Sequence, residues 1–126
     1  MRLILDAGAL VAVERANRDV VALIKRELTA GRTPLTHGGV VGQVWRGGLG
    51  RQAPLARLLP GLEVAGLDEL LGRRAGVLMG RARSSDVVDA ALVVLAMDGD
   101  SVLTSDVQDL ERLVEAADLH VDLVPV

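Results

Sequence analysis

Residues 3–8 of the chain read LILDAG, a short apolar run ended by an acid and two small residues. This pattern predicts a buried strand followed by a turn into a helix. Asp6 then stands directly after the end of the strand. In open sheets covered by helices on both faces, ligands bind beyond the carboxyl ends of the strands. We therefore expect the functional site of this chain to lie at the carboxyl ends of the strands, where Asp6 is placed.

The rest of the chain continues this alternation of strands and helices. A helix capped by Asn17 or Asp19 is expected to end at Gly31. Beyond it, the patterns predict helices over 39–46, 51–60, 67–82, 87–97 and 108–116, and strands over 62–65, 101–104 and 119–124. This order implies an α/β fold with a single domain over residues 1–126. Its central sheet is expected to be mainly parallel, with helices on both faces.

The composition fits one small cytoplasmic domain. The chain has 126 residues, half of them hydrophobic, which allows a sizeable core that must be aliphatic because Trp45 is the only aromatic residue. The absence of cysteine excludes a disulfide framework, a thiolate zinc site and a cysteine nucleophile, and is consistent with a reducing, cytoplasmic location. The longest apolar stretch, residues 90–97, is too short to span a bilayer, and the opening residues lead us to expect no secretory signal.

The charges are unevenly distributed. The net charge of −3 argues against a generally basic coat for nucleic acid. Residues 1–63 carry nine basic and five acidic side chains, whereas residues 64–126 carry five basic and twelve acidic ones. The stretch between Glu27 and Glu63 contains no acid, but it contains four arginines, Arg32, Arg46, Arg51 and Arg57. One half thus suits anionic partners and the other suits cations, with ordinary surface variation as the alternative explanation.

Several acids stand where the predicted elements begin or end. Asp106 follows the strand over 101–104 as Asp6 follows the first strand. Asp86 and Asp89 lie three residues apart near the start of the apolar helix, so they share a face. Asp89 stands among apolar residues, where a charge is costly unless it is paired, capped or bound to a metal. Acids that converge on one crevice would repel one another, and Mg²⁺ or Mn²⁺ would relieve this repulsion.

Most of these acids also have a purely structural explanation. Asp6 suits a strand-to-helix turn or a helix cap, and Asp86 suits the N-cap of the apolar helix. Asp106 suits another N-cap, with Ser105 and Gln108 forming a capping box. The residues alone leave both explanations open.

Four segments together resemble the motifs of PIN domains, the small α/β metal-dependent nucleases that include the VapC-type ribonuclease toxins of type II toxin–antitoxin systems. LILDAGALVA (3–12) resembles the opening strand with its acid, and THGGVVGQVWRG (36–47) resembles the second motif. SSDVVDAALVVLA (84–96) resembles the third motif, and VLTSDVQDLERL (102–113) resembles the fourth, with its Thr-Ser-Asp signature. The four motifs occur in the family's order and spacing over nearly the whole chain.

This resemblance implies a metal-dependent endoribonuclease. Asp6, Asp89 and Asp106 would bind Mg²⁺ or Mn²⁺, with Asp86 or Asp109 at the edge of the site. The implied reaction is hydrolysis of an RNA phosphodiester by metal-activated water. The residues expected at the substrate are Arg46, Thr104 and Ser105. The expected partners are RNA, a VapB-like antitoxin and a second copy of the chain in a homodimer, with no membrane. Arg46 and its basic neighbours suit either the RNA backbone or the antitoxin.

One position departs from the family pattern. Gln43 occupies the place in the second motif where the family supplies Glu. Gln is nearly isosteric with Glu, so the fold should accept it. It keeps one oxygen that can bind a metal but lacks the negative charge. We therefore expect Gln43 at the catalytic site, with weaker metal binding and reduced catalysis.

Two other classes of function compete with the nuclease. A PIN-like module that acts only by binding antitoxin or RNA is favoured by Gln43 and opposed by the three retained acids. A phospho-acceptor domain is suggested by the acid after the first strand. A receiver domain would need a lysine near its end, but Lys25 is the only lysine in the chain. A haloacid-dehalogenase-like phosphatase would need Asp at the position that Gly8 occupies.

Three prominent side chains are expected to be structural. His37 and His120 have no partner at metal-ligand spacing and are expected in loops or at edges. Trp45 is expected to pack its helix against the core.

Overall fold

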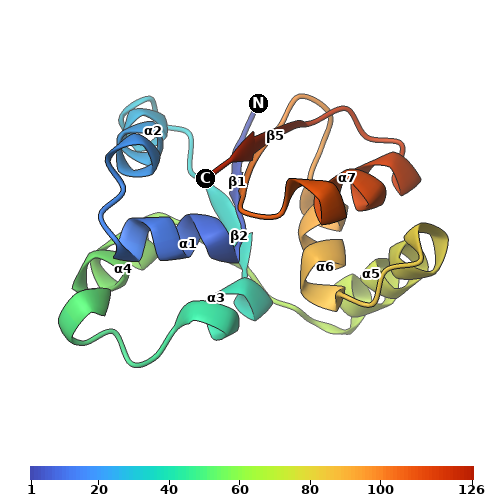
Figure 1. The fold of residues 1–126 in the computed structure, drawn as a ribbon, viewed down its shortest axis with the longest axis horizontal. Helices are drawn as coiled ribbons and strands as arrows, with labels where there is room; N and C mark the ends of the chain where they lie inside the picture. Colours follow the sequence, from blue (N-terminus) through green and yellow to red (C-terminus); the bar gives the residue numbers. More distant parts are fainter.

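The computed structural model describes residues 1–126 and has a five-stranded, wholly parallel sheet at its centre (Figure 1). The strand order is β3-β2-β1-β4-β5, so the first strand lies in the middle. The strands are β1 Leu3–Leu5, β2 Leu35–His37, β3 Glu63–Ala65, β4 Ser101–Thr104 and β5 Asp122–Pro125. The predicted α/β class and parallel sheet are confirmed.

Helices cover the sheet in two groups, which lie on its two sides in Figure 1. In the first group α1 contacts α2, α3 and α4, and in the second α5, α6 and α7 contact one another. The helices are α1 Ala7–Glu14, α2 Arg18–Thr29, α3 Gly38–Val44, α4 Ala53–Leu58, α5 Glu69–Ala82, α6 Val87–Leu95 and α7 Val107–Ala116. Short 3₁₀ turns at Gly50–Gln52 and Leu59–Gly61 flank α4. None of the helices combines the length and the apolar character that crossing a membrane requires.

Strand β2 is not predicted by the sequence patterns. It has three residues, two of them polar, and lies between β1 and β3 with Leu35, Thr36 and His37 all buried. The Thr36 hydroxyl donates to the carbonyl oxygen of Leu5 at 2.8 Å, and His37 has two partners that are described below. The expectation of His37 in a loop or at an edge is therefore wrong. Tertiary hydrogen bonds, which no local pattern reveals, allow these polar side chains to be buried.

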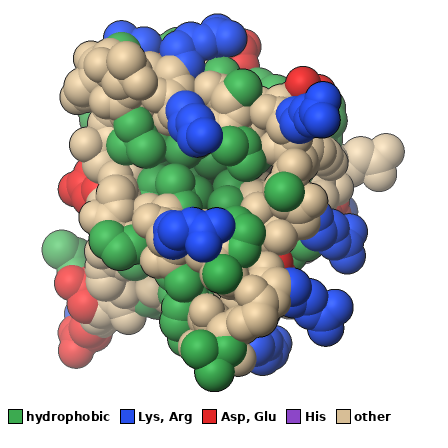
Figure 2. All heavy atoms as spheres, turned by 90° about the vertical axis from the view of Figure 1, so that its left-hand side faces the viewer, with side chains coloured by type: hydrophobic (Ala, Val, Ile, Leu, Met, Phe, Trp, Pro, Cys, Tyr) green, Lys and Arg blue, Asp and Glu red, His purple; other side chains and the backbone are tan.

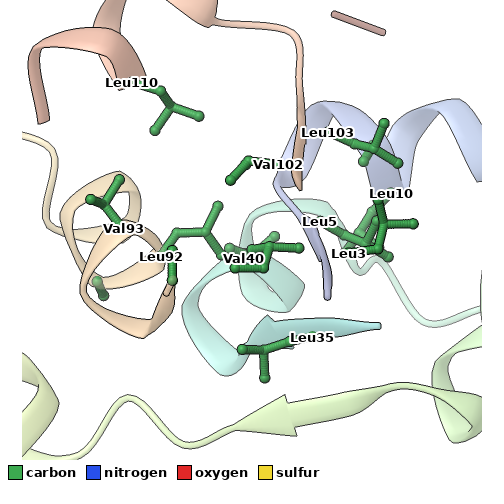
Figure 3. Packing of buried hydrophobic residues seen from close by; sticks show 14 of the residues in the cluster. Leu3, Leu5, Leu10, Leu35, Val40, Leu92, Val93, Val102, Leu103 and Leu110 are labelled. Atoms are coloured by element: carbon green, nitrogen blue, oxygen red, sulfur yellow. The ribbon is translucent and has the colours of Figure 1, made fainter. Parts of the chain in front are cut away.

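The hydrophobic core is one aliphatic cluster of 27 buried residues. Figure 3 shows that strands and helices both contribute to this cluster, among them β2 with Leu35, α3 with Val40 and α6 with Leu92. Trp45 is not part of this cluster, contrary to expectation: it is 36% exposed. Its ring lies against Gly48, where an added Cβ would come within 2.3 Å of the Trp45 Cη2 atom.

Candidate functional site

The pairing of β1 with β4 brings Asp6 and Asp106 to the same edge of the sheet. Leu5 pairs with Leu103, and the N–H of Asp6 donates to the carbonyl oxygen of Leu103 at 3.1 Å. Neighbouring parallel strands end at the same edge, so the acids that follow them lie close. Asp6 is only 5% exposed, and its Oδ1 accepts a hydrogen bond from the N–H of Ala9 at 2.9 Å. It therefore caps α1, as its structural explanation predicts, and its other oxygen receives no protein hydrogen bond.

A close backbone approach holds the Asp106 turn against the start of α1. A Cβ added to Gly8 would lie 2.3 Å from the Oγ of Ser105 and 2.9 Å from its backbone nitrogen, so only glycine fits there. Thr104 is fully buried, and its Oγ1 accepts a hydrogen bond from the N–H of Asp106 at 2.8 Å. Thr104 therefore orients the turn and has no surface for the substrate contact expected of it. Ser105 is exposed.

Helix α6 brings Asp89 to this edge from the second group of helices. The Oδ1 of Asp86 accepts a hydrogen bond from the N–H of Asp89 at 3.0 Å and so caps α6, as expected. The preceding residue, Val88, offers its carbonyl oxygen to the Nε2 of His37 at 2.9 Å. The Nδ1 of His37 accepts a hydrogen bond from the N–H of Gly39 at 3.1 Å. Because Nδ1 accepts, the proton is on Nε2, and a neutral His37 ties β2 to the start of α6.

The acids of this edge act on one another electrostatically. Burial, together with the negative charges of Asp86, Asp6 and Asp106, raises the pKa of Asp89 to about 7. The pKa of Asp106 is raised as well, first by a hydrogen bond with the side chain of Asp109 and then by burial. None of these acids takes part in an ion pair; the ion pairs of the structure are Arg2–Glu63, Arg32–Glu27, Arg73–Glu69 and His120–Asp98. The edge thus carries negative charge without a basic counter-charge.

The donors at this edge fit a divalent cation in their chemistry. They are carboxylate oxygens, the ligands that Mg²⁺ and Mn²⁺ prefer, and a cation would offset the negative charges that, together with burial, raise the pKa of Asp89. The carboxylates are farther apart than the ligands of a metal site. No group of three His, Cys, Asp or Glu side chains is close enough together to hold an ion. The acids lie within electrostatic reach of one another and do not form a coordination shell.

Gln43 lies on α3, the short helix that follows β2. It is exposed on α3 and lines a hollow of about 500 Å³ together with Arg15, Arg46 and Arg51. Neither Asp6 nor any acid of α6 or α7 lines this hollow. Arg46 is exposed, and its guanidinium donates to the carbonyl oxygens of Trp45 and Gly42 at 2.6 and 3.3 Å.

The cap explanation of Asp106 is not supported. Asp106 stands at the N-cap position of α7, but its side chain makes no capping hydrogen bond, and the capping box with Ser105 and Gln108 is absent. Sequence reasoning also missed two residues that shape the edge, Gly8 and His37. The only local sign of Gly8 is its place among small residues after Asp6, and His37 gives no local sign at all.

Comparison with known proteins bears on the fold. No family model and no curated protein matches the chain. Among solved structures 16 chains match. One belongs to the crystal structure of VapBC2 from Rickettsia felis bound to a DNA fragment from their promoter. It is 12% identical, with a TM-score of 0.70 over 98% of this chain and 98% of that chain. At this identity the likeness concerns the fold alone, and it confirms the predicted PIN-like fold.

Proposed function

We propose that the chain is a metal-dependent endoribonuclease that hydrolyses RNA phosphodiesters. The observation that supports this proposal is electrostatic repulsion among Asp6, Asp89 and Asp106 at the carboxyl edge of a PIN-like sheet. No basic side chain forms an ion pair with any of them. Such a concentration of like charges disfavours the folded state. A divalent cation is the ligand that would offset it.

The residues of this edge would have separate roles. Asp6, Asp89 and Asp106 would hold Mg²⁺ or Mn²⁺, with Asp86 or Asp109 beside them. The bound cation would supply charge to offset that of the phosphoryl oxygens and would ease the deprotonation of water. Ser105, exposed next to the acids, would hydrogen-bond a phosphate oxygen or that water.

Gln43 would make this activity weak. It stands where the resemblance implies an acid, and an amide oxygen attracts a cation less than a carboxylate does. The same substitution supports the second candidate function, a PIN-like module that has lost catalysis and acts by binding. The absence of a closed group of three acids points in the same direction.

A separate surface suits a protein partner. Figure 2 shows an apolar area between basic side chains on the face formed by the first group of helices. A groove of about 300 Å³ lies between α1, α2 and α4, lined by Val13, Val21, Ile24, Leu28, Pro54 and Leu58 with Lys25 and Arg57. Apolar walls with two cations suit a segment that carries aliphatic and acidic side chains. We infer that a VapB-like antitoxin would dock here.

A homodimer would use the other group of helices. Helix α5 exposes Leu70 and Val77, which are 67% and 58% accessible. A second copy would bury these side chains. Gel filtration at high protein concentration tests this expectation, and a monomer there would count against it.

The nuclease is tested with the purified chain, free of antitoxin, in a mixture of tRNA and rRNA with Mn²⁺ or Mg²⁺. Gln43→Glu is run beside it, with Asp89→Asn in the Gln43→Glu background as the control. Asp89→Asn is chosen over a substitution of Asp6, because loss of the Asp6 carboxylate would also remove the cap of α1. Cleavage that is strong in Gln43→Glu, weak in the natural sequence and absent in the control supports the nuclease. No cleavage by any folded form would leave the binding module.

A further inference from the structure

The hollow that contains Gln43 concentrates positive charge. It lies between α1 and the segment that joins α3 to α4, which runs beneath α1 in Figure 1. Three arginines line it, Arg15, Arg46 and Arg51, and none of them forms an ion pair. Unpaired guanidinium groups around one concave surface suit a planar or tetrahedral anion.

A buried glutamine holds the shape of this hollow. Gln52 is 6% exposed, and its Oε1 accepts hydrogen bonds from the N–H of Arg46 at 2.8 Å and of Gly48 at 3.1 Å. Its Nε2 donates to the carbonyl oxygen of Val44 at 2.9 Å and to Glu14 at 3.2 Å. Four hydrogen bonds from one buried side chain fix the course of the segment that carries Arg46 and Arg51. The arginine backbones are therefore in place before any ligand binds, which lowers the entropy cost of binding.

The balance of charges in the hollow favours an anion over a cation. Glu14 is the only acid that lines it, and its carboxylate accepts a hydrogen bond from Gln52. The three arginines thus exceed the acids by two charges. Gln43 is neutral, so it can donate an N–H to an anion, which a glutamate at the same position would repel.

The hollow also lies near the acidic edge. Val11 lines it and follows Asp6 by five residues on the same helix, which is about 8 Å along the axis. A strand that meets the acids at the start of α1 would run toward Arg15, which directly follows the end of this helix.

We propose that this hollow is a phosphate subsite for a single RNA strand, with Arg15 and Arg51 contacting the backbone and Gln43 hydrogen-bonding it. The proposal rests on RNA being the substrate and gives Gln43 a role apart from the metal. A protein partner with acidic side chains is the competing occupant. The nearness of the hollow to the acids favours RNA, because one strand could contact both.

The test is equilibrium binding of a fluorescent single-stranded RNA of mixed sequence to the full chain in EDTA, where no cleavage occurs. Arg15→Gln, Arg51→Gln and Gln43→Glu are compared with Arg26→Gln. This matched control removes an exposed, unpaired arginine of α2. Each hollow variant is expected to bind RNA about fivefold more weakly at ~0.1 M salt, and each arginine variant to lower the slope of log affinity against log salt by about 0.7. Arg26→Gln is expected to leave affinity nearly unchanged, with all variants melting like the natural chain.

Two results would overturn the subsite. One is RNA affinity that changes no more in the hollow variants than in Arg26→Gln. The other is unchanged RNA binding together with a loss of binding to polyglutamate, which would assign the hollow to an acidic protein partner. Because EDTA removes metal, this outcome is independent of the cleavage assay. If the subsite holds, Gln43→Glu raises KM for RNA even where it raises kcat.

Discussion

The Nε2 atom of His37 lies 2.9 Å from the carbonyl oxygen of Val88, the residue that precedes Asp89. This hydrogen bond joins a central strand to the start of α6, and its donor is buried. A histidine far from the acids in sequence thus fixes the helix that presents one of them.

His37→Ala is expected to lower the free energy of unfolding at pH 7.5 by about 2–4 kcal/mol, because it removes two hydrogen bonds and leaves a cavity. Burial lowers the pKa of His37 from its ordinary value of 6.5, so the folded state favours the neutral ring. The stability that this preference contributes is present above pH 6.5 and is lost as the pH falls below it. Urea unfolding at pH 7.5 and 5 should therefore show a smaller difference at pH 5. His120→Ala, at a largely exposed histidine, is the control and should change little.

Asp89→Asn is expected to stabilise the metal-free protein at alkaline pH. The pKa of Asp89 is raised to about 7, chiefly by burial and then by neighbouring acids, so the folded state favours the protonated form. That contribution is complete below the ordinary value of 3.8 and is lost as the pH rises through 7. Because Asp89 is partly exposed, we expect a gain of about 1 kcal/mol, or ~3–6 °C in Tm, at pH 8.5 in EDTA. No gain is expected at pH 4.

Thermal unfolding with added Mn²⁺ extends this comparison. The natural chain should melt at a higher temperature when Mn²⁺ is present, and Asp89→Asn should respond much less. An equal response of both proteins would show that Asp89 does not take part in cation binding.

Gly8→Ala is expected to destabilise the fold by about 1–3 kcal/mol, because its Cβ would overlap Ser105 and push the Asp106 turn away from Asp6. The clash involves the Ser105 side chain, so Ser105→Gly in the same chain should recover part of the loss. Gly76→Ala, in α5 with no atom within 4 Å of the added Cβ, is the matched control. It should stabilise by about 0.5–1 kcal/mol. Chemical denaturation measures all four proteins.

Asp68→Ala and Asp106→Ala separate a cap from a functional acid. The Oδ1 of Asp68 accepts a hydrogen bond from the N–H of Leu71 at 2.9 Å, so its loss should cost about 1 kcal/mol. Asp106 makes no capping bond, and its pKa is raised by a hydrogen bond with the Asp109 side chain, by burial and by the charge of Asp109, so its ionised form is disfavoured. Asp106→Ala should therefore leave Tm unchanged or higher and abolish cleavage. A large loss of stability in Asp106→Ala would mean that the side chain serves the helix after all.

Much of the architecture is visible in the sequence because it is local. The apolar runs Leu3–Leu5 and Ser101–Thr104 form strands at the predicted positions, and Asn17 caps α2 as its residue type suggests. The acids that follow those two strands were predicted to lie at one edge, and the β1–β4 register brings them there. Periodicity, capping and the edge rule depend only on neighbours in the chain, so the sequence is enough to reveal them.

The tertiary structure alone reveals what depends on distant partners. Strand β2 has two polar residues and no strand pattern, and it is buried because Leu5 and Val88 accept its hydrogen bonds. The motif assigns Gln43 to the metal site, and only the fold shows that it also lines a hollow with Arg15, directly after α1, and with Arg46 and Arg51 from the segment after α3. Hydrogen bonds and charges between elements have no period in the sequence. The acids were therefore predictable one by one from their neighbours, while their raised pKa values and the basic hollow appear only once the chain is folded.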